Sequence, residues 1–456
     1  MNPSKITRKA NFWKAYRREY SNLWKLGIPV LVTQIGIIVV SFADTIMVGT
    51  YGTEELAAAA FVNSLFMIPT VMQIGFAAGM TPLIGALFSR GESHEVGRTL
   101  RSGLQVNAMV SVGFTVLMGL IYFFLDYFGQ PEELLPLIRD YYLIILSTLV
   151  PMAIFNCMQQ TSNGTTDTAT PMWMILMSNV VNIVGNYALI YGHFGFPELG
   201  LQGAGISTMV ARYASVVGII IVYLRSRRYR PYLQSLRNPV EPIGGIRRKV
   251  WSTSYPVMIQ SGIECSMWSF GAIVSGWYGK IQLASYQVVN TIAQLGFMTY
   301  MSFGVACSIR VANFTGLRDI EGVKRITKAS LHLILLLATI ASAVFLVGGS
   351  RLIHVFTQDP LVVTAALALL PPLVLYQYCD AVQLTYANAL RGTSVVKPLL
   401  WISILSYIVI GIPLLLLLAS ALEWHNLGVY YSFCGALLVA AVLLYLAFHQ
   451  ALRRLK

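Results

Sequence analysis

Stretches of about 20 apolar residues recur along the whole chain, and they constrain the fold more than any other feature of the sequence. A helix needs about 20 such residues to cross the hydrocarbon core of a bilayer. Inside that core every backbone polar group has to be satisfied within the protein, which favours helices. The chain is 56% hydrophobic and only 11% charged, whereas soluble domains are about 25% charged. The pattern therefore predicts an all-α polytopic membrane protein.

Twelve apolar windows qualify as membrane spans, and the fourth and tenth of them are interrupted by polar residues. The N-terminus is basic, and no short apolar segment with a cleavage site follows it, so we expect no cleaved signal peptide. The predicted spans lie at 26–48, 56–86, 102–125, 136–160, 170–192, 202–224, 252–277, 284–309, 329–349, 362–386, 396–420 and 427–450.

The basic residues gather on one side of these predicted spans. With the N-terminus inside the cell, 28 of the 32 Lys and Arg residues fall on inner segments. The positive-inside rule then predicts a multi-pass protein of the cytoplasmic (inner) membrane with both termini in the cytoplasm. The formal net charge of +13 reflects this topology and attraction to anionic membrane lipids. It does not indicate nucleic-acid binding.

The two halves of the chain are weakly alike. "WKLGIP" at 24–29 aligns with "WSTSYP" at 251–256, and the same offset aligns "YGTEELAAAAFVN" with "YGKIQLASYQVVN". Six spans per half give both halves one orientation, so we expect two six-helix lobes related by a pseudo-twofold axis along the membrane normal. The predicted parts are a basic cytoplasmic tail (1–24), an N-lobe (25–224), a cytoplasmic inter-lobe loop (225–250), a C-lobe (251–450) and a short cytoplasmic tail (451–456).

Three carboxylates lie inside predicted spans: Asp44, Glu264 and Asp380. Each would cost roughly 2.5–3.5 kcal/mol at the centre of a membrane helix. Such residues face a wet cavity, bind a cation or carry a proton. The alternative is an ion pair that only holds helices together, and Arg212 is the one basic side chain expected inside a span.

Polar partners accompany Asp44 in the N-lobe. Asn182 and Asn186 are four residues apart, which places them on one helix face. Ser207 and Thr208 in the next span offer further oxygens, and such an oxygen-rich set suits a hard cation. The alternative for the two asparagines is an interhelical hydrogen bond without a role in transport.

The C-lobe has a second candidate site. Tyr376 precedes Asp380 by one helical turn, and Glu264 is expected to meet both. Two neighbouring carboxylates share a proton or hold a cation, because both do not stay charged alone.

The remaining chemistry-bearing residues show no pattern of an enzyme. Neither the 5 cysteines nor the 6 histidines have metal-ligand spacing, and no nucleophile–base set is evident, so we expect no cofactor and no enzymatic activity. Aromatic and Met side chains suit organic cations of varied shape. The residues expected to line a substrate cleft between the lobes are Phe66, Met67, Met72, Phe155, Met298, Met301 and Tyr386.

Four segments together resemble the multidrug and toxic compound extrusion (MATE) family, most closely its NorM-type branch. They are "SFADTIMVG", "NIVGNYALIYGHFGFPELGLQGAG", "SGIECSMWSFGAIVSGWYG" and "YQYCDAVQLTYANALRG". The resemblance implies a twelve-helix antiporter that exports cationic amphipathic compounds in exchange for Na⁺ or H⁺. It implies coupling roles for Asp44, Asn182 and Asn186 in the N-lobe and for Glu264, Tyr376 and Asp380 in the C-lobe. Some relatives carry Asp where Asn186 stands.

The expected function is therefore multidrug efflux by alternating access, carried out by a monomer. Its expected partners are organic cation substrates, a coupling cation, which is Na⁺ or H⁺, and membrane lipids. The alternative is a lipid-linked oligosaccharide flippase of the same superfamily, which would need basic residues inside its spans. The sequence leaves open which cation is coupled and which lobe binds it.

Overall fold

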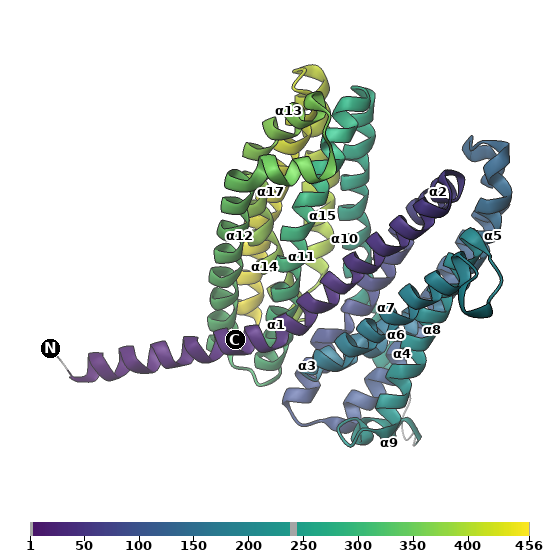
Figure 1. Ribbon diagram of the computed structural model, residues 1–456. Coiled ribbons are helices and arrows are strands. Elements are labelled where there is room, and N and C mark those ends of the chain that lie inside the picture. Colours follow the sequence, from purple (N-terminus) through teal and green to yellow (C-terminus); the bar gives the residue numbers. More distant parts are fainter. Residues whose placement is uncertain (1–2, 238–243, 456) are drawn as a thin grey trace. The chain divides into compact units, whose positions relative to one another are not determined.

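The computed structural model describes the backbone of residues 3–237 and 244–455 and the side chains of residues 16–234 and 245–455. The predicted inter-lobe loop and the two predicted tails are partly outside these residues. Within the described chain all regular structure is helical (Figure 1). This confirms the predicted all-α class.

Eleven helices of the described chain are long and apolar enough to cross a membrane. A twelfth span is present when a bent pair, α13 (Pro360–Ala368) and α14 (Leu370–Gly392), is counted as one, with a bend of 44° between the two helices. The number of predicted spans is thus confirmed. The bend coincides with the irregular tenth window, and Pro371 and Pro372 at the start of α14 cannot donate the backbone hydrogen bonds that would continue α13.

The chain divides into two compact units, which we call unit 1 and unit 2. Unit 1 comprises the chain up to Leu31 together with Ile259–Lys456, and unit 2 is Val32–Met258. The divisions fall inside two long helices, α1 (Pro3–Tyr51) and α10 (Gly244–Trp277). Each of these helices therefore contributes one part to each unit.

Unit 2 contains the second part of α1 and the first part of α10. Between them lie α2 (Thr53–Ala78), α3 (Met80–Ser89), α4 (Ser93–Tyr122), η1 (Leu125–Phe128), η2 (Glu132–Leu134), α5 (Leu135–Ser147), α6 (Leu149–Gly164), α7 (Ala169–Ile190), η3 (His193–Gly195), α8 (Gly200–Arg225) and α9 (Arg230–Arg237). Helices α7 and α8 pack along each other, and α4 packs against α6 and α9. The pairing of α7 with α8 brings polar side chains of these two helices together.

Unit 1 is built around α14. The helices that follow α10 are α11 (Lys280–Gly316), α12 (Ile320–Phe356), α13, α14, α15 (Lys397–Ser403), the π-helix η4 (Ile404–Gly411), α16 (Ile412–Leu416), the π-helix η5 (Leu417–Ala421) and α17 (His425–Arg454). Helix α14 packs against α11, α12 and α17 (Figure 1). It is buried from Thr385 to Gly392 without interruption, so its polar residues are enclosed by protein.

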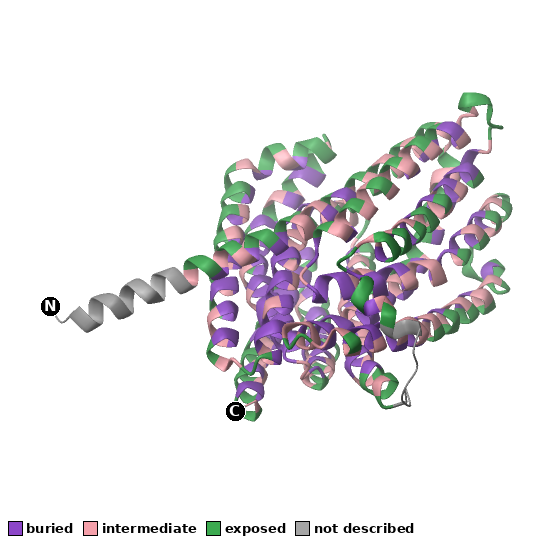
Figure 2. Ribbon diagram, turned by 90° about the horizontal axis from the view of Figure 1, so that it is seen from below, coloured by how far each residue is buried: buried purple, intermediate pink, exposed green. Residues whose placement is uncertain are grey.

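Single helices carry both exposed residues on one side and buried residues on another. Figure 2 shows buried and exposed residues alternating on the same ribbons. Large apolar side chains such as Val347, Leu346 and Trp401 are exposed, as expected of a surface that faces lipid. The interior holds many buried polar residues, among them Asn186, Gln377 and Asp380. The polar groups thus lie inside the units.

Candidate cation-binding sites

A chain of hydrogen bonds joins the predicted site residues of unit 2. Asn186 Nδ2 donates to Asp44 Oδ1 at 2.5 Å and lies 3.4 Å from Asn182 Oδ1. Asn182 Nδ2 in turn donates to Thr208 Oγ1 at 3.1 Å. The structure therefore brings together Asp44, Asn182, Asn186 and Thr208, which come from α1, α7 and α8. Asn186 Oδ1 is buried and has no hydrogen-bond partner in the described chain.

A glycine allows α7 and α8 to approach at this site. A Cβ atom added at Gly185 would lie 2.4 Å from Ser207 Oγ, which is closer than a carbon and an oxygen can approach without displacement. Ser207 Oγ donates to the backbone carbonyl of Asn182 at 2.7 Å. Gly185 thus permits the close helix contact that positions the two asparagines.

Arg212 lies near Asp44 but is not paired with it. The two side chains interact electrostatically, whereas the Arg212 guanidinium donates to Thr148 Oγ1 at 2.5 Å. No salt bridge joins Asp44 to a basic side chain among the residues the structure describes. Asp44 is therefore held directly by an amide, and Arg212 acts on it only as a nearby charge.

The site of unit 1 is centred on Glu264, which is half-buried on α10. Its Oε1 accepts hydrogen bonds from Gln260 at 3.2 Å, from Gln383 at 3.1 Å and from Tyr407 at 3.5 Å. These donors come from α10, α14 and η4. Three neutral donors on one carboxylate oxygen stabilise its charged form.

Asp380 lies in the same unit and interacts electrostatically with Glu264. It is 2% exposed, and its Oδ2 has no hydrogen-bond partner in the described chain. Tyr376, one turn earlier on α14, is also buried and packs edge-on against Trp268 with ring centroids 5.3 Å apart. The structure thus places Glu264, Tyr376 and Asp380 in one buried polar region.

Arg391 is a buried basic side chain that the sequence analysis did not single out. It lies in the last turn of α14 and is 7% exposed. It interacts electrostatically with Glu264. In the sequence Arg391 stands next to Gly392, five residues beyond the end of the tenth predicted window, so it resembled one more charge of an inner loop.

The other groups that sequence reasoning missed are Gln260, Gln383 and Tyr407. Gln260 is four residues before Glu264, and this spacing is a signal that places both on one helix face. Gln383 follows Asp380 by three residues, which is a similar signal. Tyr407 has none, because nothing in its neighbourhood relates it to α10.

The residues predicted to line a substrate cleft have different surroundings in their own units. Phe66 is buried and packs against Tyr142 at 4.8 Å between ring centroids. Phe155 and Tyr386 are buried, Met67 is exposed, and Met72, Met298 and Met301 are partly buried. Their contact with a transported compound stays a prediction.

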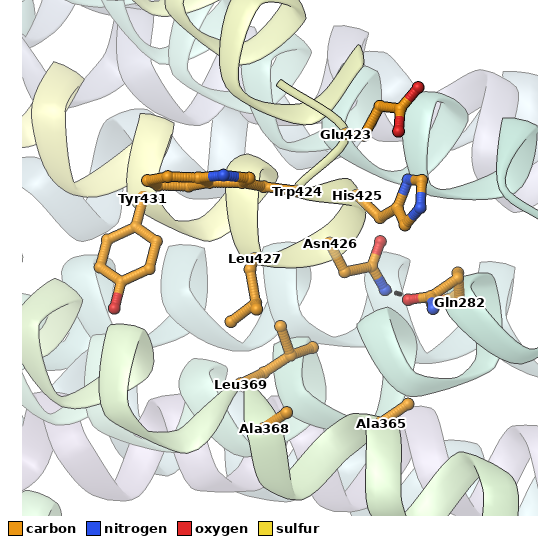
Figure 3. A pocket seen from close by; sticks show the side chains of 10 residues that line it. All are labelled: Gln282, Ala365, Ala368, Leu369, Glu423, Trp424, His425, Asn426, Leu427 and Tyr431. Atoms are coloured by element: carbon orange, nitrogen blue, oxygen red, sulfur yellow. Dashed lines mark hydrogen bonds between the residues drawn. The ribbon is translucent and has the colours of Figure 1, made fainter. Parts of the chain in front are cut away.

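A cavity of about 530 Å³ lies at the end of unit 1 where α17 begins. Figure 3 shows Trp424, Asn426 and Leu427 on one side of it and Ala365, Ala368 and Leu369 on the other. Asn426 Nδ2 donates to the Gln282 carbonyl at 2.6 Å. None of the predicted site residues lines this cavity.

Comparisons with known proteins agree with this architecture. The model of the MatE family matches residues 29–188 and 256–417, more than half of the chain. A probable multidrug resistance protein NorM of Mannheimia succiniciproducens is 27% identical over 445 residues, which cover 96% of this chain and 95% of the relative. Its counterpart in Xanthomonas axonopodis pv. citri is 26% identical over 94% of both chains. The crystal structure of a mutant of the Vibrio cholerae MATE transporter VcmN superposes with a TM-score of 0.85, at 18% identity, over 97% of this chain and 98% of that one.

Proposed function

The chain belongs to the MatE family, and from this membership we propose that it exports cationic amphipathic organic compounds in exchange for Na⁺ or H⁺. It is a multi-pass membrane protein and a transporter, not an enzyme. The multidrug resistance named in its NorM relatives supports the substrate class. The buried carboxylates Asp44, Glu264 and Asp380 support cation coupling.

The observation that carries the proposal is the buried carboxylate of Asp380, one oxygen of which has no partner among the residues that the structure describes. An unpaired charge inside a membrane protein is strongly disfavoured. A small cation or a proton bound there removes this penalty, and so does an organic cation. Competition of the two for the same negative charge couples their fluxes, provided that each favours a different conformation.

We further propose that the coupling cation binds in unit 1. When ionised, Glu264 and Asp380 outnumber the single Arg391 near them, so this cluster has a net charge of −1. In unit 2 the charge of Asp44 is balanced by Arg212. A monovalent cation would therefore neutralise the cluster of unit 1, with oxygens from the two acids and from Tyr376 or Tyr407 as its ligands.

The proposed setting is the inner membrane, with both termini in the cytoplasm and the protein acting as a monomer. The excess of Lys and Arg on the segments expected inside supports this orientation. The alternative of a lipid-linked oligosaccharide flippase would require a cationic site for pyrophosphate. Each cluster described above instead contains at least as many carboxylates as guanidinium groups.

Transport by the purified protein in proteoliposomes tests the proposal. We expect ethidium flux when a Na⁺ gradient or a pH gradient is imposed, and the effective gradient identifies the coupling cation. Asp380→Asn should abolish coupled flux, and Asp44→Asn should weaken it. Glu133→Gln, which removes an exposed acid of η2, is the matched control. Full coupled flux in Asp380→Asn would contradict the proposal, and flux of a lipid-linked oligosaccharide without ethidium flux would favour the flippase.

A further inference from the structure

One face of α14 is lined by buried polar residues over about four turns. Gln377, Asp380, Asn388 and Arg391 fall within an arc of roughly 80° on a helix of 3.6 residues per turn, and they extend over about 21 Å. Their exposed fractions are 0%, 2%, 1% and 7%. This polar face begins near Asp380 and ends at the last turn of α14.

The facing helix α11 leaves room for these side chains. Gly296, Tyr300, Gly304 and Ser308 recur every four residues along it. A Cβ atom added at Gly296 would lie 2.5 Å from Gln377 Oε1, and one added at Gly304 would lie 2.6 Å from Asn388 Nδ2. The glycines therefore accommodate the amides of α14.

The polar groups of these two faces are mostly not paired with one another. Buried atoms without a hydrogen-bond partner in the described chain include both amide atoms of Gln377, Asp380 Oδ2, Tyr300 Oη, Ser308 Oγ and Arg391 Nε. Each such atom costs about 1–3 kcal/mol if it stays unsatisfied. Polar groups inside a membrane protein are tolerated where they line water. Interhelical hydrogen bonding alone does not account for this interface.

We infer that the facing sides of α11 and α14 form a hydrated path between the acid pair Glu264/Asp380 and the end of unit 1 at Arg391. Water in this path satisfies the unpartnered amides and hydroxyls. Arg391 adds a fixed positive charge where the path ends, close enough to Glu264 to interact with it. A monovalent cation or a proton leaving the acid pair passes along this route. The movement of the ion along this route rests on the proposed function. The presence of water between α11 and α14 does not depend on it.

Cysteine accessibility tests the hydration independently of transport. In a background in which the 5 native cysteines are replaced by Ala, Asn388→Cys is compared with Ala389→Cys. Both positions are essentially fully buried, but they lie on different faces of α14. A small cationic methanethiosulfonate should label the cysteine at position 388 at least about tenfold faster than that at 389. Ser308→Cys, on the facing side of α11 near Gly392, provides a second position if the first variant does not fold, and equal rates at the path position and at position 389 would overturn the inference.

Two further measurements concern the charge and the ion. Adding Arg391→Gln to Asn388→Cys should raise the rate of labelling by the cationic reagent on the order of tenfold, because a repelling charge is removed. An unchanged rate would contradict the placement of Arg391 in the path. Labelling should lower the gradient-driven ethidium flux of Asn388→Cys well below the flux of the same variant before labelling, and equal flux before and after labelling would show that ions take another route. If the unmodified protein itself shows no coupled flux, the proposed function fails while the labelling contrast stands.

Discussion

Gln383 on α14 donates a hydrogen bond to Glu264 on α10 across 3.1 Å, and the two residues are 119 positions apart in the sequence. Gln383 is 2% exposed, so this bond is shielded from bulk water. It fixes one oxygen of a carboxylate that we propose to bind the coupling cation. The position of the Glu264 carboxylate therefore depends on how α14 packs against α10.

Gln383→Leu is expected to weaken cation binding and to lower stability. The substitution removes a buried donor to a carboxylate, which typically costs about 1–3 kcal/mol. Thermal unfolding in detergent, measured with and without Na⁺, checks both effects. Gln358→Leu, at an exposed position, is the control. Unchanged stability and unchanged response to Na⁺ in Gln383→Leu would argue against a role of this bond.

Gly185→Ala should disrupt the site of unit 2. The added methyl group would meet Ser207 Oγ at 2.4 Å, and the hydroxyl cannot move away without losing its bond to the Asn182 carbonyl. We expect a loss of roughly 1–3 kcal/mol of stability and reduced transport. Adding Ser207→Gly should restore part of the stability by making room. Gly113→Ala is the control, since the added carbon meets no described atom within 4 Å apart from its own helix backbone and chain neighbours. An equal loss in both variants would contradict the explanation.

Asp167, in the segment between α6 and α7, should make the folded protein less stable at low pH. Burial alone would raise the pKa of Asp167, but hydrogen bonds from Tyr229 and Thr170 and the charge of Arg228 hold that pKa below its usual value. A lowered pKa in the folded state gives stability that is present above about pH 4, the ordinary Asp value, and is lost as pH falls through the folded pKa. Asp167→Asn should therefore flatten the decline in melting temperature below pH 4. A decline as steep as that of the wild type would contradict this.

Tyr229 should contribute at the opposite end of the pH range. Burial raises the pKa of Tyr229, and its hydrogen bond to Asp167 at 2.7 Å raises it further. A raised pKa in the folded state gives stability that is present below about pH 10 and is lost as pH rises through the folded pKa. Tyr229→Phe is expected to lower stability by about 1 kcal/mol at neutral pH. Tyr127→Phe, at a position that is 85% exposed, should leave stability unchanged in the same thermal assay.

Glu19 should anchor the first part of α1 to α11 and α12 within unit 1. It is 3% exposed, and its carboxylate lies 3.5 Å from both the Arg310 and the Arg325 guanidinium groups. Glu19→Gln leaves these two partly exposed cations facing each other and should cost about 1–3 kcal/mol, visible as a lower melting temperature. Glu92→Gln breaks an exposed pair with Arg90 and should cost at most about 1 kcal/mol. Similar losses in the two variants would contradict the anchoring role.

The sequence permits the spans and the candidate acids to be predicted because both follow from local rules. The length of an apolar stretch identifies a span, and a carboxylate inside a span is conspicuous because of the free energy that its charge costs there. The four-residue spacing of Asn182 and Asn186 likewise predicts a common face, and both do hydrogen-bond within one network with Asp44 and Thr208.

The remaining features depend on tertiary packing, which local rules do not contain. Tyr407 reaches Glu264 from a helix 143 positions away, and no pattern in either segment relates them. Arg391 lies five residues beyond the end of the tenth predicted window, and such a charge is ordinarily at the membrane surface. Its burial results from the packing of α14 against three neighbours, and the sequence does not reveal that arrangement.

The π-helical geometry of η4 has a consequence for Tyr407. Its backbone bonds run from residue i to i+5, one position farther than in an α-helix. Conversion of η4 to α-helix would rotate every side chain beyond the converted turn about the helix axis. The phenol would then turn away from Glu264 while the helix itself kept its place. The winding of η4 thus matters directly to the hydrogen bond between Tyr407 and Glu264.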